Sequence, residues 1–250
     1  MSRPWFSNNF SLLAPALATH KANIQMENTH CQIVVLISGN GSNLQALIDA
    51  STASKFKVVA VVSNNPDAFG LQRATAADIP TRVVDHGDYA SRQDYDRKLI
   101  EVIDEFDPRL IVLAGFMRIL SPVFVQHYQG RILNIHPSLL PAYTGVNTHQ
   151  RVLDAGEKEH GVSVHFVTEG LDGGPVIAQE KIDILATDTA AQLATRVAAK
   201  EHIIYPKVVS WFAAGRLHME GDGAYLDHEK LPGGGVEVYP AASMDSIRLP

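Results

Sequence analysis

The stretch that decides the fold is Gln32–Ser38, with the sequence QIVVLIS, followed at once by Gly39–Asn43, with the sequence GNGSN. The first part is a continuous apolar run rich in β-branched residues, which is typical of a strand buried on both faces. The second part ends the strand with glycines before Leu44–Ala50 begins a helix. A buried strand, a glycine turn and a helix in this order predict the first unit of a parallel sheet.

Apolar runs and amphipathic stretches alternate as far as His136. Ser91–Phe106 has apolar residues at helical spacing, and Ser121–Pro122 is typical of the cap and first residue of another helix. A short helix is also expected to end near Asp78. The predicted strands of this region are Val58–Ser63, Thr81–Val84, Leu110–Gly115 and Arg131–His136. Strands that alternate with helices predict βαβ units, and therefore an α/β fold with a mainly parallel sheet flanked by helices.

The second half of the chain has a different pattern. Gly161–Thr168 alternates between apolar and polar residues, and Pro175–Ile184 follows it after an Asp-Gly-Gly turn. Two neighbouring strands with a short connection predict an antiparallel addition to the sheet, towards the C-terminus. A long helix follows, for which we expect Thr187 or Asp188 as the cap and an end near Gly215.

Pro206 lies within this long helix. Because proline has no backbone N–H and its ring clashes with the preceding turn, we expect it to kink or divide the helix. For Arg216–Pro250, where glycines gather in clusters, we predict a short hairpin followed by a loose tail.

Composition narrows the class of protein. The 250 residues are 46% hydrophobic and 19% charged, with a formal net charge of −6. These values are typical of a globular protein, and the acidic balance argues against a nucleic-acid-binding surface. No apolar run approaches the roughly 20 residues of a membrane helix, and the single cysteine, Cys31, excludes an internal disulfide. We therefore expect a cytoplasmic protein with neither a nucleic-acid nor a membrane partner.

The glycine loop after the first strand, Ser38–Asn43, has the form of an anion site. Backbone N–H groups at the start of a helix attract negative charge. The loop begins like a dinucleotide fingerprint, but Leu44 stands where the third glycine would be, and the second strand ends without an acidic residue. The loop predicts a site for phosphate or another anion, with a purely structural tight turn as the alternative.

Three polar residues stand near predicted strand ends. Asn134 and His136 are two residues apart, so both point to one face at the C-terminal end of their strand. Asp172 lies on a separate glycine-rich loop, Glu169–Pro175. Asn134 and a protonated His136 are suited to donate hydrogen bonds to a developing oxyanion, while Asp172 stabilises the imidazolium. From spacing alone, a structural hydrogen-bond network is the alternative.

No residue of the predicted site is a nucleophile of the usual kind. Cys31 precedes the sheet, and there is no Gly-x-Ser-x-Gly elbow. We therefore expect the attacking group to belong to the substrate.

Four runs of sequence resemble the folate-dependent phosphoribosylglycinamide formyltransferase family: Val34–Ala50, Leu113–Val125, Leu133–Tyr143 and His160–Gln179. The resemblance is collinear from about Gln32 to Leu231. It implies a Rossmann-like formyltransferase fold. It also implies transfer of a formyl group from the co-substrate 10-formyltetrahydrofolate to the primary amine of glycinamide ribonucleotide, in purine biosynthesis. The amine attacks directly, so no acyl-enzyme forms.

The resemblance also implies roles for individual residues. The catalytic residues are Asn134, His136 and Asp172; the ribonucleotide-binding residues are Gly41, Ser42, Asn43 and Glu201; and the folate-binding residues are Arg92, Met117, Arg118, Ile119, Leu120 and Asn134. No metal is expected, because the spacing of His149, His160 and His165 fits no compact ligand motif. His165 alternates with apolar neighbours and is expected to face the active-site side of its strand.

The domain organisation follows from the extent of the resemblance. We expect a loosely ordered N-terminal arm at residues 1–31, a formyltransferase domain at 32–231 and a C-terminal tail at 232–250. The partners implied are the two small-molecule substrates, for a monomer or a homodimer.

Other functions are weighed against this one. Methionyl-tRNA formyltransferase needs a basic tRNA-binding domain for which this chain has neither the length nor the charge. Formyltetrahydrofolate deformylase, in which water replaces the amine, stays an alternative, although the GNGSN loop favours the ribonucleotide enzyme. A non-catalytic nucleotide-binding module is the third candidate, and the intact set of Asn134, His136 and Asp172 argues against it.

Overall fold

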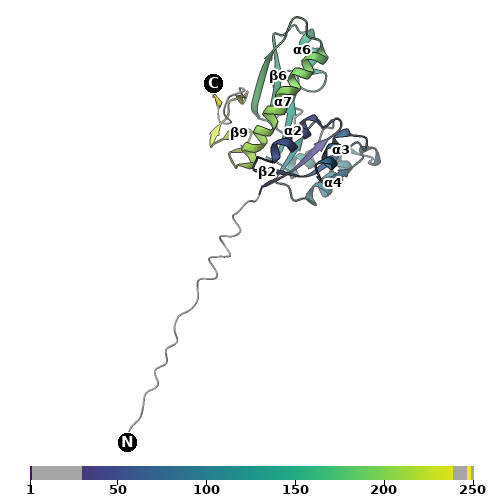
Figure 1. The fold of residues 1–250 in the computed structure, drawn as a ribbon, viewed down its shortest axis with the longest axis vertical. Helices are drawn as coiled ribbons and strands as arrows, with labels where there is room; N and C mark the ends of the chain where they lie inside the picture. Colours follow the sequence, from purple (N-terminus) through teal and green to yellow (C-terminus); the bar gives the residue numbers. More distant parts are fainter. Residues whose placement is uncertain (2–29, 239–246, 249–250) are drawn as a thin grey trace. The chain divides into compact units, whose positions relative to one another are not determined.

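The computed structural model describes residue 1 and residues 30–238 and 247–248 (Figure 1). The chain divides into two units, Met1–His30 and Cys31–Pro250. The arm predicted at 1–31 lies outside the described residues except for residues 1, 30 and 31. The last of these, Cys31, already belongs to the first strand.

A large mixed sheet forms the centre of the second unit. Its strand order among the described residues is β12-β11-β7-β6-β5-β4-β1-β2-β3. The strands are β1 (Cys31–Ile37), β2 (Phe56–Ser63), β3 (Thr81–Val83), β4 (Leu110–Leu113), β5 (Ile132–His136), β6 (Glu159–Phe166), β7 (Val176–Asp183), β11 (Val236–Val238) and β12 (Ile247–Arg248). The strands from β3 to β5 are parallel, and β6 and β7 pair antiparallel. The predicted α/β fold with a mainly parallel sheet and an antiparallel addition is confirmed.

Helices cover both faces of this sheet, which explains the continuous apolar run of β1. The helices are α2 (Ser42–Ser51), α3 (Phe69–Ala76), α4 (Arg92–Asp104), α5 (Pro122–His127), α6 (Thr148–Asp154) and α7 (Ala190–Ala213), with a short 3₁₀ turn at His86–Asp88. Ile33 and Val35 pack in one core with residues of α2, α3 and α7. Val34 and Leu36 pack in a second core with residues of α4 and α5. Alternate residues of one strand therefore serve two hydrophobic cores.

A second, smaller sheet follows α7. It has three antiparallel strands, β8 (Leu217–Glu220), β9 (Gly223–Leu226) and β10 (Glu229–Lys230), so the predicted hairpin is present and carries a further strand. The segment 232–250, which we expect to be a tail, contributes β11, whose Val236 and Val238 are buried against the main sheet. Residues 239–246 and 249–250 of that segment lie outside the described residues.

Of the two predicted helix caps, one differs from the observed cap. The cap of α7 is Thr189 rather than Thr187 or Asp188: its hydroxyl accepts a hydrogen bond from Gln192 N, and the Gln192 side chain accepts one from Thr189 N. This capping box uses two otherwise unpaired donors at once. For α5 the predicted start is confirmed, with Ser121 as the cap and Pro122 as the first residue, although the Ser121 hydroxyl makes no capping bond and its N–H donates to the buried carboxylate of Asp96.

Pro206 does not divide α7, which continues through it from Ala190 to Ala213. The residues around it, among them Tyr205 and Val208, are fully buried against the sheet. Packing of this apolar face therefore maintains the helix although Pro206 cannot donate a backbone hydrogen bond.

No helix of the described residues is both long and apolar enough to span a membrane.

The strand order reverses beside β1. The chain passes from β1 to β2 and β3 on one side and then returns to β4 and β5 on the other. At such a reversal the loops that follow the two central strands separate, and ligands of parallel sheets bind there. The glycine loop after β1 and residues 114–120 after β4 are the two loops concerned.

Tyr205 joins α7 to this end of the sheet, and we predict that it contributes to stability. Its hydroxyl, fully buried, donates towards Leu113 O at 2.8 Å and Leu133 O at 3.0 Å. Replacing Tyr205 by Phe should lower the free energy of unfolding by about 1–3 kcal/mol, because buried carbonyls lose a donor. Urea denaturation measures this. Tyr225→Phe, on the small sheet, is the matched control, and an equal effect of the two variants would contradict the prediction.

Candidate active site

The glycine loop is shaped for an anion by its backbone. Gly41 has φ +74° and stands immediately before α2, whose first residues are Ser42 and Asn43. The N–H groups of a first helical turn have no intrahelical partner, and Gly41 supplies no side-chain cap to occupy them. A Cβ at Gly41 would also lie 2.7 Å from Gly70 Cα, so the close approach of α3 requires glycine here. The predicted helix start at Leu44 is two residues late.

Arg73, which the sequence analysis did not single out, holds this loop from α3. Its Nε donates to Asn40 O at 2.9 Å and its Nη2 to Asn40 Oδ1 at 3.1 Å. Gly70 N also donates to Gly39 O at 3.0 Å. A charged residue within a helix carries no local signal of such a role, because the contact depends on how α3 packs beside the loop.

Asn43 and Glu201, predicted to bind the same ligand, are brought together from α2 and α7. Asn43 Nδ2 donates to Glu201 Oε2 at 2.7 Å. Burial raises the pKa of the Glu201 carboxyl, while the hydrogen bond from Asn43 acts in the opposite direction. The glycine loop and the carboxylate therefore form one polar surface, beside a concavity of about 560 Å³ lined by residues that include Ser42, Gln45, Arg73 and His202.

His136 and Asp172 also meet, at the end of β5. His136 Nδ1 lies 3.5 Å from Asp172 Oδ2, and both side chains are buried. Asp172 has a left-handed φ of +49° and accepts a hydrogen bond from Gly145 N at 2.8 Å, which fixes its carboxylate. The loop reaches this position by passing close to β6, where a Cβ on Gly174 would overlap the Phe166 carbonyl. The pair places an imidazole and a carboxylate side by side in a site shielded from water.

The other nitrogen of His136 has a partner that sequence reasoning did not find. His136 Nε2 donates to Tyr143 O at 2.9 Å. In this arrangement one ring nitrogen faces a carboxylate and the other a backbone carbonyl, so a substrate oxygen can receive the Nε2 hydrogen bond only by taking the place of that carbonyl.

His165 orients Asn134. The two residues are paired directly across β5 and β6, and Asn134 Nδ2 lies 3.0 Å from His165 Nε2. Since His165 Nδ1 donates to Phe166 O at 2.8 Å, Nε2 is the acceptor, and the Asn134 amide N–H donates to it. Burial lowers the pKa of His165, which favours this neutral form. The expected orientation of His165 is observed, but only the antiparallel register could have identified its partner.

The residues predicted to bind folate lie on and near the segment that follows β4. Met117 and Ile119 are exposed, Leu120 is buried, and the Arg118 guanidinium lies 4.9 Å from the centre of the Tyr95 ring. Arg118 Nε is buried without a hydrogen-bond partner among the described residues. Arg92 is exposed at the start of α4, after the cap Ser91.

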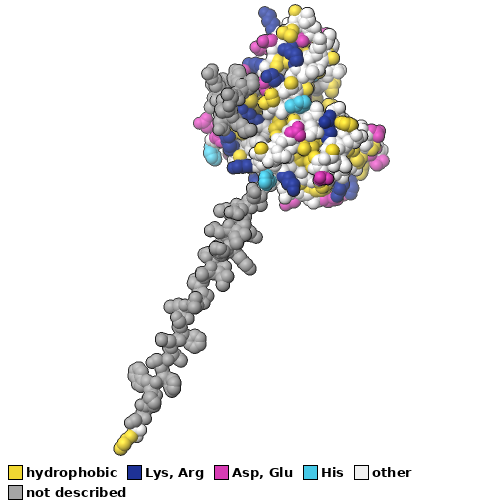
Figure 2. Space-filling view, in the orientation of Figure 1, with side chains coloured by type: hydrophobic (Ala, Val, Ile, Leu, Met, Phe, Trp, Pro, Cys, Tyr) yellow, Lys and Arg dark blue, Asp and Glu magenta, His cyan; other side chains and the backbone are white. Residues whose placement is uncertain are grey.

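On the face drawn in Figure 2, basic, acidic and hydrophobic side chains are mixed, and no broad basic surface covers it.

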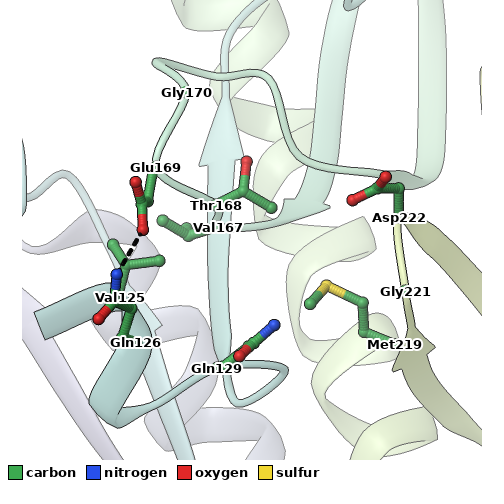
Figure 3. A pocket seen from close by; sticks show the side chains of 10 residues that line it. All are labelled: Val125, Gln126, Gln129, Val167, Thr168, Glu169, Gly170, Met219, Gly221 and Asp222. Atoms are coloured by element: carbon green, nitrogen blue, oxygen red, sulfur yellow. Dashed lines mark hydrogen bonds between the residues drawn. The ribbon is translucent and has the colours of Figure 1, made fainter. Parts of the chain in front are cut away.

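A second concavity, of about 690 Å³, lies at the opposite end of the strands. It contains none of the predicted site residues and is lined by Val125, Gln126, Gln129, Val167, Thr168, Glu169, Gly170, Met219, Gly221 and Asp222 (Figure 3). A hydrogen bond of 2.8 Å from Gln126 to Glu169 crosses one side of it. Val167, which lines this concavity, donates its N–H to Ile132 O at the beginning of β5. His136 is at the other end of the same strand, so the concavity and His136 lie at opposite ends of β5.

The three histidines considered as metal ligands do not converge. His149 Nδ1 and His160 Nε2 lie 2.9 Å apart and share a hydrogen bond, while His165 contacts Asn134. Among the described residues, no group of three or more His, Cys, Asp or Glu side chains is arranged to hold a metal ion.

Comparison with known proteins gives one consistent result. A family model described as formyl transferase matches residues 31–209. The phosphoribosylglycinamide formyltransferase of Escherichia coli strain K12 is 58% identical over 202 residues, which cover 80% of this chain and 95% of that protein. The trifunctional purine biosynthetic protein adenosine-3 of Homo sapiens is 42% identical over 203 residues, which cover 80% of this chain and 20% of that protein. The structure of phosphoribosylglycinamide formyltransferase from Coxiella burnetii in complex with CHES is similar at a TM-score of 0.81 and 55% identity, covering 84% of this chain and 99% of that one.

The His149–His160 pair predicts a loss of stability in acid. Burial, with smaller effects from the charges of His149 and His136, lowers the pKa of His160 to about 4. Between the ordinary histidine pKa and this value the unfolded chain binds a proton that the folded chain does not, so stability falls as the pH falls. For His160 the loss should reach roughly 3 kcal/mol by the lower end of that range.

Urea denaturation between pH 7.5 and pH 5 measures this dependence. His160→Gln should weaken it, because the variant has no titrating group at this position. His228→Gln, at an exposed position of the small sheet, is the control. An unchanged pH dependence in His160→Gln would contradict the prediction.

Proposed function

The chain belongs to the formyl transferase family, among its phosphoribosylglycinamide formyltransferases. On this premise we propose that it transfers the formyl group of 10-formyltetrahydrofolate to the primary amine of glycinamide ribonucleotide, in purine biosynthesis. The observation that carries the proposal is the buried contact of 3.5 Å between His136 and Asp172, in the same strand end as Asn134. An amide and an imidazole beside a carboxylate suit acyl transfer to an external amine.

The reaction that we propose needs no nucleophile from the protein. The amine nitrogen attacks the formyl carbon, the carbonyl oxygen becomes an oxyanion, and the bond from carbon to N10 of the folate then breaks. One amine proton passes in the net reaction to N10, so the products are the N-formyl ribonucleotide and tetrahydrofolate. Asn134 and His136 donate hydrogen bonds to the oxyanion, and Asp172 stabilises the imidazolium form of His136.

Two details of the geometry support these roles. Asn134 donates one amide hydrogen to His165 and retains a second for a ligand. His136 Nε2 donates to Tyr143 O, and in the reaction the oxyanion takes the place of this carbonyl. Tyr143 begins a short irregular segment with Gly145 before α6, and a shift of this segment would vacate the position.

The same premise assigns the substrate sites. The ribonucleotide phosphate binds at Gly41, Ser42 and Asn43, and Glu201 holds its sugar or glycinamide portion; the first-turn N–H groups of α2 support this. The folate binds along Met117, Arg118, Ile119 and Leu120, with Arg92 and Asn134. We further propose a cytoplasmic enzyme that uses no metal and acts as a monomer or homodimer.

A single assay tests the proposed reaction against its alternatives. Purified protein is mixed with 10-formyltetrahydrofolate, with and without glycinamide ribonucleotide, and the release of tetrahydrofolate is followed. We expect release only when the ribonucleotide is present, together with formation of the formylated product. Release that ignores the ribonucleotide would establish a deformylase instead, and no release under either condition would favour a binding module without catalysis.

Asp172→Asn tests the role of the carboxylate. Asparagine retains an oxygen that can accept from Gly145 N but loses the charge that stabilises the His136 imidazolium. The turnover number should fall by about 10²–10⁴ while the thermal unfolding midpoint changes little. Asp154→Asn, whose carboxylate bonds to Gln150 on the surface of α6, is the control. Turnover close to that of the unaltered enzyme would refute the role given to Asp172.

A further inference from the structure

Ser38, the first residue of the glycine loop, makes hydrogen bonds away from that loop. Its N–H donates to Gly115 O at 3.2 Å, and its hydroxyl oxygen accepts from Met117 N at 2.8 Å. The same hydroxyl donates its proton to Asn64 Oδ1 at 2.6 Å. One half-buried serine therefore joins the ends of three neighbouring strands, β1, β2 and β4.

These bonds extend the pairing of β1 with β4 beyond the sheet. The last paired residues of the two strands are Leu36 and Leu113, after which Ala114 N still donates to Leu36 O. Ser38 continues the pairing at Gly115 through its N–H. Its hydroxyl then accepts from Met117 N, as a strand carbonyl would do in a regular sheet. Its own carbonyl faces Asn65 Nδ2, at 3.4 Å.

Asn64 determines the direction of the hydroxyl proton. Asn64 is buried, and His86 Nδ1 lies 3.1 Å from its backbone carbonyl oxygen and 3.4 Å from its side-chain Nδ2. With its side-chain oxygen towards Ser38, it can only accept the serine proton, which leaves a serine lone pair aimed at Met117 N. The donor and acceptor capacities of the hydroxyl are thus both used.

The segment held in this way, 115–120, has little else in its backbone to define its course. It contains neither helix nor strand. Phe116 and Leu120 are buried in the second core, which holds the two ends of the segment, whereas the side chains of Met117 and Ile119 are 76% and 50% exposed. The hydrogen bond that Met117 N donates to the Ser38 hydroxyl therefore constrains the part of the segment that packing holds least.

The remainder of the glycine loop is held separately. Asn40 is bonded by Arg73, and Gly39 O by Gly70 N. Loss of the Ser38 hydroxyl should leave these contacts in place, and with them the start of α2.

From these contacts we propose that Ser38 is a positioning residue for the formyl donor rather than for the ribonucleotide, although it opens the ribonucleotide loop. The inference rests on the proposed function, in which residues 117–120 line the folate site. Through the Asn64–Ser38–Met117 chain of hydrogen bonds, the end of β2 sets the position of one wall of that site.

The test compares Ser38→Ala, Ser38→Thr and the control Ser51→Ala, which removes another serine hydroxyl, bonded only to Ile48 O within α2. Steady-state kinetics give the KM for each substrate, and calorimetry gives the Kd for tetrahydrofolate, which has no formyl group to transfer. Ser38→Ala should raise the donor KM and the tetrahydrofolate Kd about tenfold, because Met117 N–H loses its acceptor. The ribonucleotide KM should stay close to that of the unaltered enzyme.

Threonine keeps the hydroxyl, so Ser38→Thr should restore most of the donor affinity, and Ser51→Ala should match the unaltered enzyme. Equal changes in the two KM values, or an unchanged donor KM in Ser38→Ala, would overturn the inference. If Ser38→Ala does not fold, Asn64→Ala, which removes the acceptor that orients the serine hydroxyl, should shift the donor KM alone in the same direction, and no such shift overturns the inference. If the unaltered enzyme binds no tetrahydrofolate, the proposed function itself fails; if it binds and Ser38→Ala binds equally, only this inference fails.

Discussion

Burial of β1 on both faces is the constraint on which the rest of the structure depends. Its alternate residues enter two hydrophobic cores, so the strand lies at the centre of the sheet with helices on either side. The strand order reverses next to it, and the loops that leave β1 and β4 therefore separate. These two loops carry most of the residues of the two proposed substrate sites. Ser38 connects them at the last point where the strands remain adjacent.

A second constraint is the set of partners around the buried histidines His165 and His136, which differs between the two rings. His165 is held neutral by burial, with Nδ1 donating to a carbonyl, and so accepts from Asn134. His136, two residues along β5 from Asn134, has the Asp172 carboxylate beside its Nδ1. Two neighbouring imidazoles thus have different partners: one meets an amide, and the other a carboxylate and a backbone carbonyl. Asp172 lies near both rings, 3.5 Å from His136 Nδ1 and 3.9 Å from His165 Nε2.

The sequence predicts this fold well where the signal is local and periodic, and poorly where it is not. Apolar runs locate the parallel strands to within a few residues, because burial on both faces leaves little freedom of composition. The sequence does not predict the helix cap at Thr189 or the strand at Val236–Val238. Several polar residues offer similar caps near α7, and a short apolar run pairs with β7 only because the chain returns there.

The sequence by itself determined the fold class and, through the spacing of Asn134 and His136, that an amide and an imidazole share one strand end. It also indicated an anion site in the glycine loop. The Asn134–His136 spacing and the glycine loop could both be recognised because each depends only on residues that are neighbours in the chain. Only the tertiary structure decided which groups these side chains meet: His165 at Asn134, the Tyr143 carbonyl at His136, Arg73 at Asn40 and Met117 N at Ser38. Such contacts join residues that are distant in sequence or held by irregular loops. Their partners are set by how strands and helices pack, for which a single sequence carries no local signal.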